Sequence, residues 1–352
     1  MGCNNKNTPN PRLGTVGGQA VMEGVMMKSK TTVATAVRKY DGSITVKKSP
    51  VKSIKNKHKI FRVPLIRGIV NFVEMMILSF STLSDSAQML GIEMEEPGKF
   101  GKWLEKRFGK SIMTLITALS VVLGVVLAFF LFIWLPAFVT KLINRYIVNL
   151  GGLFALVEGL FKMAIFVSYI LLVSLMKDIK RVFSYHGAEH KSIFAYEAGE
   201  ELTVENVKAK SRFHPRCGTS FIFVLLIISI LVGAVLPKKI LFIRVALRLL
   251  TFPVVVGIGY EYIIYVGKHS NALTRIFSAP GLWMQRVTTK EPDDKMIEVA
   301  IAALKSALPD EFPGFEVTSE KTEETIATDD ANQTQETVIQ EAELKTEETA
   351  NS

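Results

Sequence analysis

Cysteine and charged residues are scarce in this 352-residue chain. Its two cysteines, Cys3 and Cys217, are too few for a disulfide scaffold and fit a reducing compartment. Charged residues make up 21% of the chain and hydrophobic residues 49%. Because the apolar residues are also bunched, the chain is neither wholly soluble nor disordered. Residues 1–20 lack an apolar core, so we expect no signal peptide.

Aromatic residues are absent from residues 316–352, where eleven Asp or Glu stand against two Lys. Such a segment cannot bury enough apolar surface to fold, so we expect a disordered acidic tail there. The whole chain carries +9, so residues 1–315 carry +18. In a chain this apolar, that charge favours anionic lipid headgroups as the partner, and we expect no nucleic acid.

Four segments are long and apolar enough to cross a bilayer, which takes about 20 helical residues. They are 112–138, 151–176, 219–236 and 240–266. The first and third lack the polar stripe of a surface helix, which argues against buried helices of a soluble protein. The fold class is therefore a mainly α-helical, multi-pass membrane protein with about four transmembrane helices, within a membrane domain at 99–291.

The distribution of Lys and Arg predicts how these helices are oriented. The connections at 99–110, 177–216 and 268–290 hold seventeen of them, and those at 139–150 and 237–239 hold four. We therefore expect both termini in the cytoplasm, together with the His-rich loop 177–218.

A further apolar stretch, residues 64–90, is interrupted by Arg67, Glu74 and Asp85. Dense positive charge flanks it on both sides, so both flanks are predicted to be cytoplasmic. This favours an interfacial or re-entrant helix within 63–98, with a fifth span as the alternative.

Two smaller cytoplasmic elements flank the membrane domain. Apolar and polar residues alternate around Asp41–Gly42, which predicts a β-hairpin within segment 1–62. Residues 293–308 show helical periodicity between Pro292 and Pro309. They predict an amphipathic helix within segment 292–315.

The sharpest chemical signal is the pattern His186-Gly-Ala-Glu189-His190. On a helix, residues four apart share a face, so both imidazoles can reach one metal ion. Glu189 could then act as the catalytic base and take a proton from a water activated by the ion, as in inverted zincin proteases. The alternative is a solvated helix with two exposed histidines.

His214-Pro-Arg-Cys217 supplies a histidine nitrogen and a cysteine sulfur, and zinc accepts both. The predicted topology brings His214 to the cytoplasmic face beside the HGAEH motif. We therefore predict a site for Zn²⁺, or another divalent metal, formed by His186, His190, His214 and Cys217. The alternative for the last two is a turn at the membrane boundary with a buried thiol.

Three further residues are candidates for additional ligands. Glu23 lies between glycines and methionines in GGQAVMEGVMM, Glu261 lies in the fourth predicted span, and His269 follows that span. A tight turn packed by methionines is the alternative for Glu23.

Charged residues inside membrane spans are costly and point to function by default. Glu158 and Lys162 lie in the second predicted span, and Arg244 and Arg248 lie at similar depth in the fourth. Two ion pairs that hold these spans together are the simpler interpretation. The alternative is a polar path toward Glu261, which is typical of a transporter.

Four motifs together resemble the YqhQ-like family of bacterial multi-pass membrane proteins: GGQAVMEGVMM, YHGAEHKSIFAYE, RFHPRCGTSF and PGLWMQRVTTKEPDD. The resemblance runs from about residue 12 to residue 308 and leaves out the acidic tail. It implies the bacterial cell membrane, the topology above and a suspected metal-dependent site, but no substrate. Its motif residues here are Glu23, His186, Glu189, His190, His214 and Cys217, with Glu261 and the segment Trp283–Asp294 behind them.

Three functions remain open at this point. The first is a metal-dependent hydrolase at the cytoplasmic membrane face, acting on a lipid headgroup or a membrane peptide. The second is a non-enzymatic scaffold or assembly factor with a structural metal closed by four protein ligands, since catalytic zinc keeps an open position. The third is a small transporter that uses the charges of the second and fourth spans.

Overall fold

The computed structural model describes residues 11–54, 58–91, 111–237, 240–268 and 272–316. Helices dominate these residues, and they include one small β-sheet near the N-terminus. His269 and residues 317–352, which make up nearly all of the predicted acidic tail, lie outside the described residues.

The sheet is an antiparallel meander in the order β1-β2-β3-β4. Its strands are β1 (Gly17–Val21), β2 (Gly24–Lys28), β3 (Thr32–Arg38) and β4 (Ile44–Pro50). The predicted hairpin around Asp41–Gly42 is confirmed as β3–β4, with Gly42 at φ +86° as a tight turn requires. The β1–β2 hairpin was not predicted, because a segment rich in glycine and methionine lacks the β-branched alternation of a strand.

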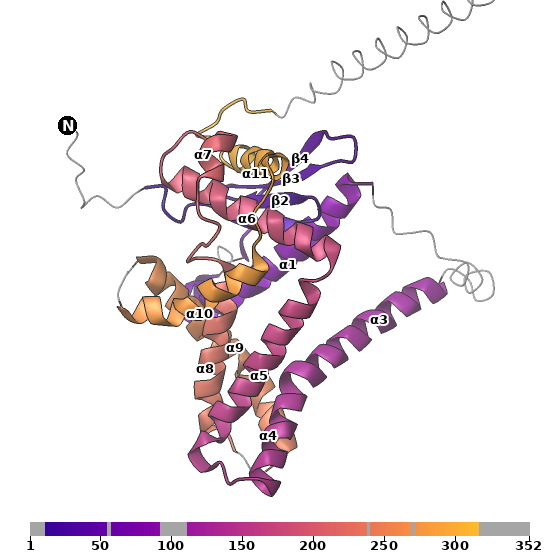
Figure 1. Ribbon diagram of the computed structural model, residues 1–352, viewed down its shortest axis with the longest axis vertical. Coiled ribbons are helices and arrows are strands. Elements are labelled where there is room, and N and C mark those ends of the chain that lie inside the picture. The colour runs from indigo at the N-terminus through magenta and orange to yellow at the C-terminus, as the bar shows by residue number, and fades with distance from the viewer. Residues whose placement is uncertain (1–10, 55–57, 92–110, 238–239, 269–271, 317–352) are drawn as a thin grey trace, which may run out of the picture.

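Two helices cover the sheet: α6 (Lys177–Glu197) and α11 (Asp294–Ala307), with the short α7 (Val204–Lys208) beside them (Figure 1). The predicted helix at 293–308 forms, and the Asp293 side chain caps it by accepting the Met296 N–H at 2.8 Å. Unlike a surface amphipathic helix, α11 is buried along almost its whole length, because the sheet lies on one side and α6 and α7 on the other.

Among the described residues, five helical segments are long and apolar enough to cross a membrane, namely Ile66–Met89, Leu119–Tyr146, Gly151–Val173, Gly218–Val235 and Leu241–Tyr265. Their elements are α1 (Ile66–Met89), α3 (Ser111–Phe129), α4 (Leu135–Tyr146), α5 (Phe154–Val173), α8 (Gly218–Val235) and α9 (Leu241–Lys268). The last four candidates coincide with the four predicted spans. The molecule is therefore compatible with a multi-pass membrane protein.

The first predicted span extends beyond its predicted end at residue 138, because the helix continues through Pro136. Pro136 stands at the start of α4, directly after a π-helical turn at Phe130–Trp134. A proline removes one backbone N–H donor, and the wider π turn before it accommodates that loss within one continuous helical rod. The helix therefore continues to Tyr146.

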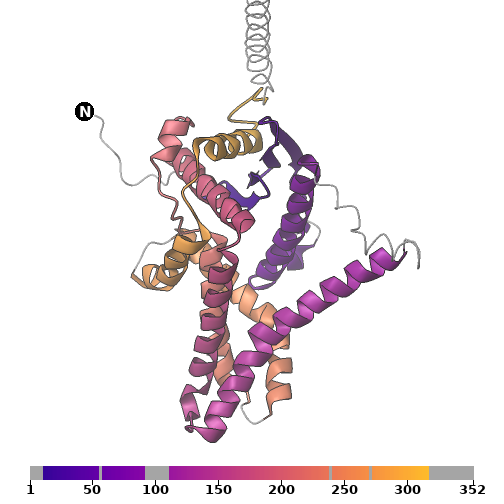
Figure 2. The ribbon, with the colours of Figure 1, turned by 45° about the vertical axis from the view of Figure 1, so that its right-hand side comes forward.

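The remaining candidate, α1, is one unbroken helix, so residues 58–91 contain no re-entrant turn. At its start Gly68 packs against Gly257 and Tyr260 of α9. Toward its end Asp85 forms an ion pair with Lys47 of β4 at 2.7 Å. The helix thus runs from the membrane helices to the sheet, as Figure 2 shows, and its last turns lie against the sheet rather than among the apolar helices.

The sheet with α6, α7 and α11 forms one layer of the molecule, the sheet layer, and the candidate membrane helices form the other, the membrane layer. The two layers meet where α10 (Ala272–Thr288) packs on the first turn of α8. Gly281 permits this contact, because a Cβ there would lie 2.4 Å from the Ser220 Cα. The chain after α10 then passes over α6, where Lys290 N–H donates to the Phe183 carbonyl at 2.8 Å. The middle of α6, the start of α8 and the end of α10, which are distant in sequence, are thereby brought together.

Candidate metal site at the junction of the two layers

The HGAEH motif lies in the middle of α6, and its two histidines share one face of the helix. The ring centroids of His186 and His190 are 4.4 Å apart. Both side chains face the start of α8 and the end of α10 rather than solvent, and His190 is fully buried. The solvated helix with two exposed histidines is therefore not what forms.

Each of these imidazoles is held by a backbone carbonyl at its Nδ1. His186 Nδ1 lies 2.9 Å from the Thr288 oxygen, and His190 Nδ1 lies 2.6 Å from the Arg212 oxygen. A carbonyl can only accept, so each Nδ1 carries a proton, and in a neutral ring this leaves the lone pair on Nε2 for a metal ion. This is the arrangement by which proteins orient histidines that bind metal ions.

Cys217 completes a group of three donor atoms. Its Sγ lies 3.3 Å from His186 Nε2, and the ligand atoms of His186, His190 and Cys217 all lie within 4.8 Å of one another. Cys217 is the N-cap of α8, where its sulfur accepts the Thr219 N–H. Two imidazole nitrogens and one thiol are a donor set that zinc accepts.

His214, the fourth predicted ligand, lies next to this group but not within it. Its ring centroid is 5.5 Å from that of His190. Its Nδ1 accepts the Arg216 backbone N–H at 3.3 Å, and its Nε2 lies 3.7 Å from Glu197. Burial lowers the pKa of His214, with the Glu197 carboxylate opposing that shift.

The sequence did not single out the residues that hold the His214 loop. Gln285 of α10 accepts the His214 N–H and donates to its carbonyl, both at 2.8 Å. Glu197 at the end of α6 accepts hydrogen bonds from the Arg216 guanidinium and from the Gly14 N–H. Gln285 lies within the Trp283–Asp294 motif, which was the available signal for it.

Glu189 is buried on α6, one residue before His190, and it is only 5% exposed. Its Oε2 has no hydrogen-bond partner among the described residues. Burial raises the pKa of Glu189 to about 7, while the nearby His186 acts in the opposite direction. A buried carboxylate without a partner is costly, and such groups are retained mainly where they have a task.

Gly18 of β1 makes room for this carboxylate. A Cβ at residue 18 would lie 2.8–2.9 Å from the Glu189 Cγ, Cδ and Oε1 atoms. We therefore expect Gly18→Ala to push the Glu189 side chain aside and to destabilise the protein by about 1–3 kcal/mol, the usual cost of overpacking. Thermal unfolding in detergent measures this.

The same substitution in a Glu189→Ala background is the control, because the atoms that would clash are then absent. The cost of Gly18→Ala should largely disappear in that double mutant. An equal cost in both backgrounds would show that Gly18 serves the strand and not the glutamate.

Glu23 does not join the donor group. It lies in the β1–β2 turn at φ +47°, accepts two hydrogen bonds from Arg181 at 2.6 and 2.5 Å, and lies 3.3 Å from the Tyr185 hydroxyl. The bond to Glu23 raises the pKa of Arg181. Glu23 thus fastens the strained hairpin, and with it Gly18, to α6. The turn expected as its alternative is present.

The predicted intramembrane charges and Glu261 also lie away from the donor group. Glu261 forms an ion pair with Arg67 of α1 and accepts the Leu65 N–H. Glu158 pairs with Arg244 and Arg248.

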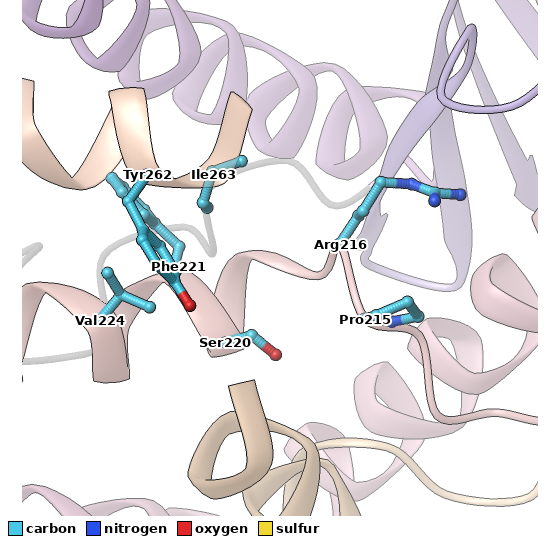
Figure 3. Close-up of a pocket in the computed structure, with 7 residues that line it drawn as sticks. All are labelled: Pro215, Arg216, Ser220, Phe221, Val224, Tyr262 and Ile263. Carbon is cyan, nitrogen blue, oxygen red and sulfur yellow. The ribbon is translucent and has the colours of Figure 1, made fainter. Parts of the chain in front are cut away.

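A small, mostly apolar pocket lies between the first turns of α8 and the last turns of α9 (Figure 3). Phe221, Val224, Tyr262 and Ile263 gather around it, and the Arg216 guanidinium points away from them. Pro215 and Arg216, at its edge, directly precede Cys217 in the chain. The pocket therefore adjoins the donor group on the side of the membrane helices.

Residues 63–310 match a family described as "Protein of unknown function (DUF1385)". The chain is also similar to "Uncharacterized protein YqhQ" of Bacillus subtilis (strain 168). The two are 38% identical over 293 residues, which cover 83% of this chain and 92% of that protein. No solved structure matches the chain.

Proposed function

The chain belongs to the YqhQ-like DUF1385 family, and we propose that it is a metal-dependent hydrolase of the bacterial cell membrane. The observation that carries this proposal is the group of three donors, His186, His190 and Cys217, together with the buried carboxylate of Glu189 on the same helix as the two histidines. Catalytic zinc sites use three protein ligands and keep a fourth position open, whereas structural sites are closed by four.

His186, His190 and Cys217 would hold the ion. A zinc ion there supplies a Lewis acid, which makes a water molecule acidic near neutral pH. Glu189, whose Oε2 has no hydrogen-bond partner among the described residues, would be the base for a water at this site. The carbonyls of Thr288 and Arg212 keep both imidazole rings in the orientation that this requires.

The location of the site supports a substrate that comes from the membrane. Cys217 is the residue from which the candidate span α8 begins. With both termini in the cytoplasm, as the positive charges predict, the site lies at the cytoplasmic face. The excess of positive charge in residues 1–315 then favours contact with anionic headgroups.

Metal content tests the first part of the proposal. Full-length protein purified in detergent is expected to carry about one zinc ion per chain, measured by elemental mass spectrometry. His186→Ala/His190→Ala should lose it, because two of three ligands are gone. His214→Ala should keep it, because the His214 nitrogens are occupied by Arg216 and Glu197. Wild-type protein without metal, even after growth with added zinc, would overturn the proposal.

Glu189→Gln tests the hydrolytic part. This variant should retain its metal but leave the substrate uncleaved. Membranes from cells that make it should then accumulate a lipid or peptide that is absent from cells with the wild-type protein, as mass spectrometry would show. Identical membranes, with metal retained in both, would contradict catalysis by Glu189.

A scaffold with a structural metal is the second candidate, and one observation favours it. The donor group joins α6 of the sheet layer to α8 of the membrane layer, so a bound ion would fasten the two layers together. This candidate requires a fourth protein ligand. It therefore predicts that His214→Ala loses its metal as fully as the His186→Ala/His190→Ala double mutant does.

A further inference from the structure

A second cluster of charged residues lies at the far end of the membrane helices, opposite the sheet. It joins Glu158 and Lys162 of α5 to Arg244 and Arg248 of α9, near the lower ends of these helices in Figure 1. Glu158 is fully buried, and the Arg248 side chain is only 8% exposed. The metal site does not involve any of these residues.

Glu158 and Arg244 form an ion pair, and Arg244 also donates hydrogen bonds to carbonyls at the end of α8. Arg244 Nε and Nη2 lie 2.9 and 2.8 Å from Glu158 Oε2. The same guanidinium donates to the carbonyls of Gly233 and Leu236, both at 2.9 Å. Arg244 is therefore a structural residue that caps the C-terminal carbonyls of α8.

The donor groups of Arg248 and Lys162 have fewer hydrogen-bond partners. Arg248 Nη1 lies 2.5 Å from Glu158 Oε1, but its Nε is buried without a hydrogen-bond partner among the described residues. Lys162 has one long hydrogen bond, of 3.4 Å, to the Ser229 hydroxyl. Both side chains are left with donors that can bind a further group.

The cluster also carries an excess of positive charge. Two guanidinium groups share the Glu158 carboxylate, and Lys162 adds a third positive charge one helical turn further along α5. Uncompensated charge in a membrane span is costly, so it is found where a counter-ion or a ligand comes to it. One anion between Lys162 and Arg248 would supply that compensation.

The depth of the cluster suits an anion at the membrane surface. Glu158 is about 6 Å from the start of α5 and Arg248 about 10 Å from the start of α9, at 1.5 Å per residue. The hydrocarbon core is about 30 Å thick, and long basic side chains reach outward from such depths to phosphate groups.

We propose that Lys162 and Arg248, with Arg248 held by Glu158 and Lys162 by Ser229, form a binding site for a phosphate group. Arginine and lysine donors together are the usual partners of phosphate in proteins. The phosphate comes either from the headgroup of an anionic lipid or from a free anion. Gly233 leaves room for the Arg248 side chain, because a Cβ at residue 233 would lie 2.8 Å from Arg248 Nη2 and would displace the guanidinium.

The test uses full-length protein, delipidated in dodecyl maltoside. Native mass spectrometry measures the binding of phosphatidylglycerol, and equilibrium dialysis measures that of radioactive inorganic phosphate. Arg248→Gln and Lys162→Met should each weaken binding about tenfold or more, because each removes a charge-assisted hydrogen bond. Arg145→Gln is the matched control. Arg145 is a cation in the last turn of α4, next to the connection that leads into α5, and lies outside the cluster.

The arms of the test distinguish the two sources of phosphate. Variant-sensitive binding of phosphatidylglycerol alone assigns the site to a lipid headgroup, and binding of inorganic phosphate assigns it to a free anion. Lys162→Met should also raise the melting temperature of the lipid-free protein, since it relieves repulsion, and should abolish any further rise on adding phosphatidylglycerol. If the wild-type protein binds neither probe, or if the Arg145→Gln control weakens binding as much as the two variants do, the proposal is wrong.

Discussion

Glu158→Ala is expected to destabilise the folded protein by about 3–5 kcal/mol, the usual cost of removing one partner from a buried ion pair. The reason is that Glu158 is fully buried and holds two arginines, at 2.8 and 2.5 Å. Without it, Arg244 and Arg248 become buried cations with no carboxylate within the cluster. Unfolding of the purified protein by increasing mole fractions of denaturing detergent measures the loss.

Two variants act as controls for this result. Glu200→Ala removes the acid of a solvent-exposed ion pair with Lys210, so it should cost at most about 1 kcal/mol. The double variant Glu158→Ala/Arg248→Leu removes a charge of each sign, and it should recover part of the stability lost in Glu158→Ala. If Glu158→Ala costs no more than Glu200→Ala, the cluster does not contribute to stability as its geometry indicates.

The sequence predicted that these charges would meet, but not how they would be arranged. Similar depth in two spans was enough to expect ion pairs between the second and fourth spans. The pairing is unequal, with one carboxylate serving two arginines while Lys162 turns to Ser229 of α8. Depth along a helix is readable from sequence, whereas rotation about its axis depends on packing against neighbouring helices.

The same limit applies to the metal site. Helical spacing placed His186 and His190 on one face, and the predicted topology brought Cys217 to the same end of the bundle. His214 was equally well placed by that reasoning. It differs only in the hydrogen bonds that its nitrogens make to Arg216 and Glu197, and no spacing rule reveals those.

The carbonyls that orient the histidines could not be predicted from the sequence, for a different reason. Thr288 and Arg212 contribute backbone oxygens, so the identity of their side chains carries no signal. Glycines were more informative. Gly18 and Gly187 both lie in motifs that the sequence singled out, and each makes room for a neighbouring group that a Cβ would meet.

The sheet layer and the neighbouring α1 show which elements local sequence pattern can predict and which it cannot. The hairpin at Asp41–Gly42 and the helix at 293–308 follow from turn chemistry and periodicity, and both form. The continuity of α1 could not be read in the same way. Its interrupting charges find partners on other elements, as Asp85 does with Lys47 of β4 and Arg67 with Glu261 of α9, so they do not break the helix.

Gly187→Ala is expected to have the second large effect, through the chain segment that passes over α6. A Cβ at residue 187 would lie 2.1 Å from the Lys290 carbonyl oxygen. That oxygen belongs to backbone, so the segment from Thr288 to Lys290 must move away from the helix. The Thr288 carbonyl, which holds His186 Nδ1 at 2.9 Å, then moves with it.

Loss of such an orienting bond typically lowers metal affinity by about 10–100-fold. Competition with a chelating dye should show a decrease of that size for zinc in Gly187→Ala, together with a lower melting temperature. Gly17→Ala is the matched control, because a Cβ at residue 17 meets nothing within 4 Å. Since the two substitutions add the same methyl group, a zinc affinity that falls only in Gly187→Ala must arise from the displaced segment. Equal affinities in the two variants would mean that the Thr288 carbonyl is not needed to hold His186.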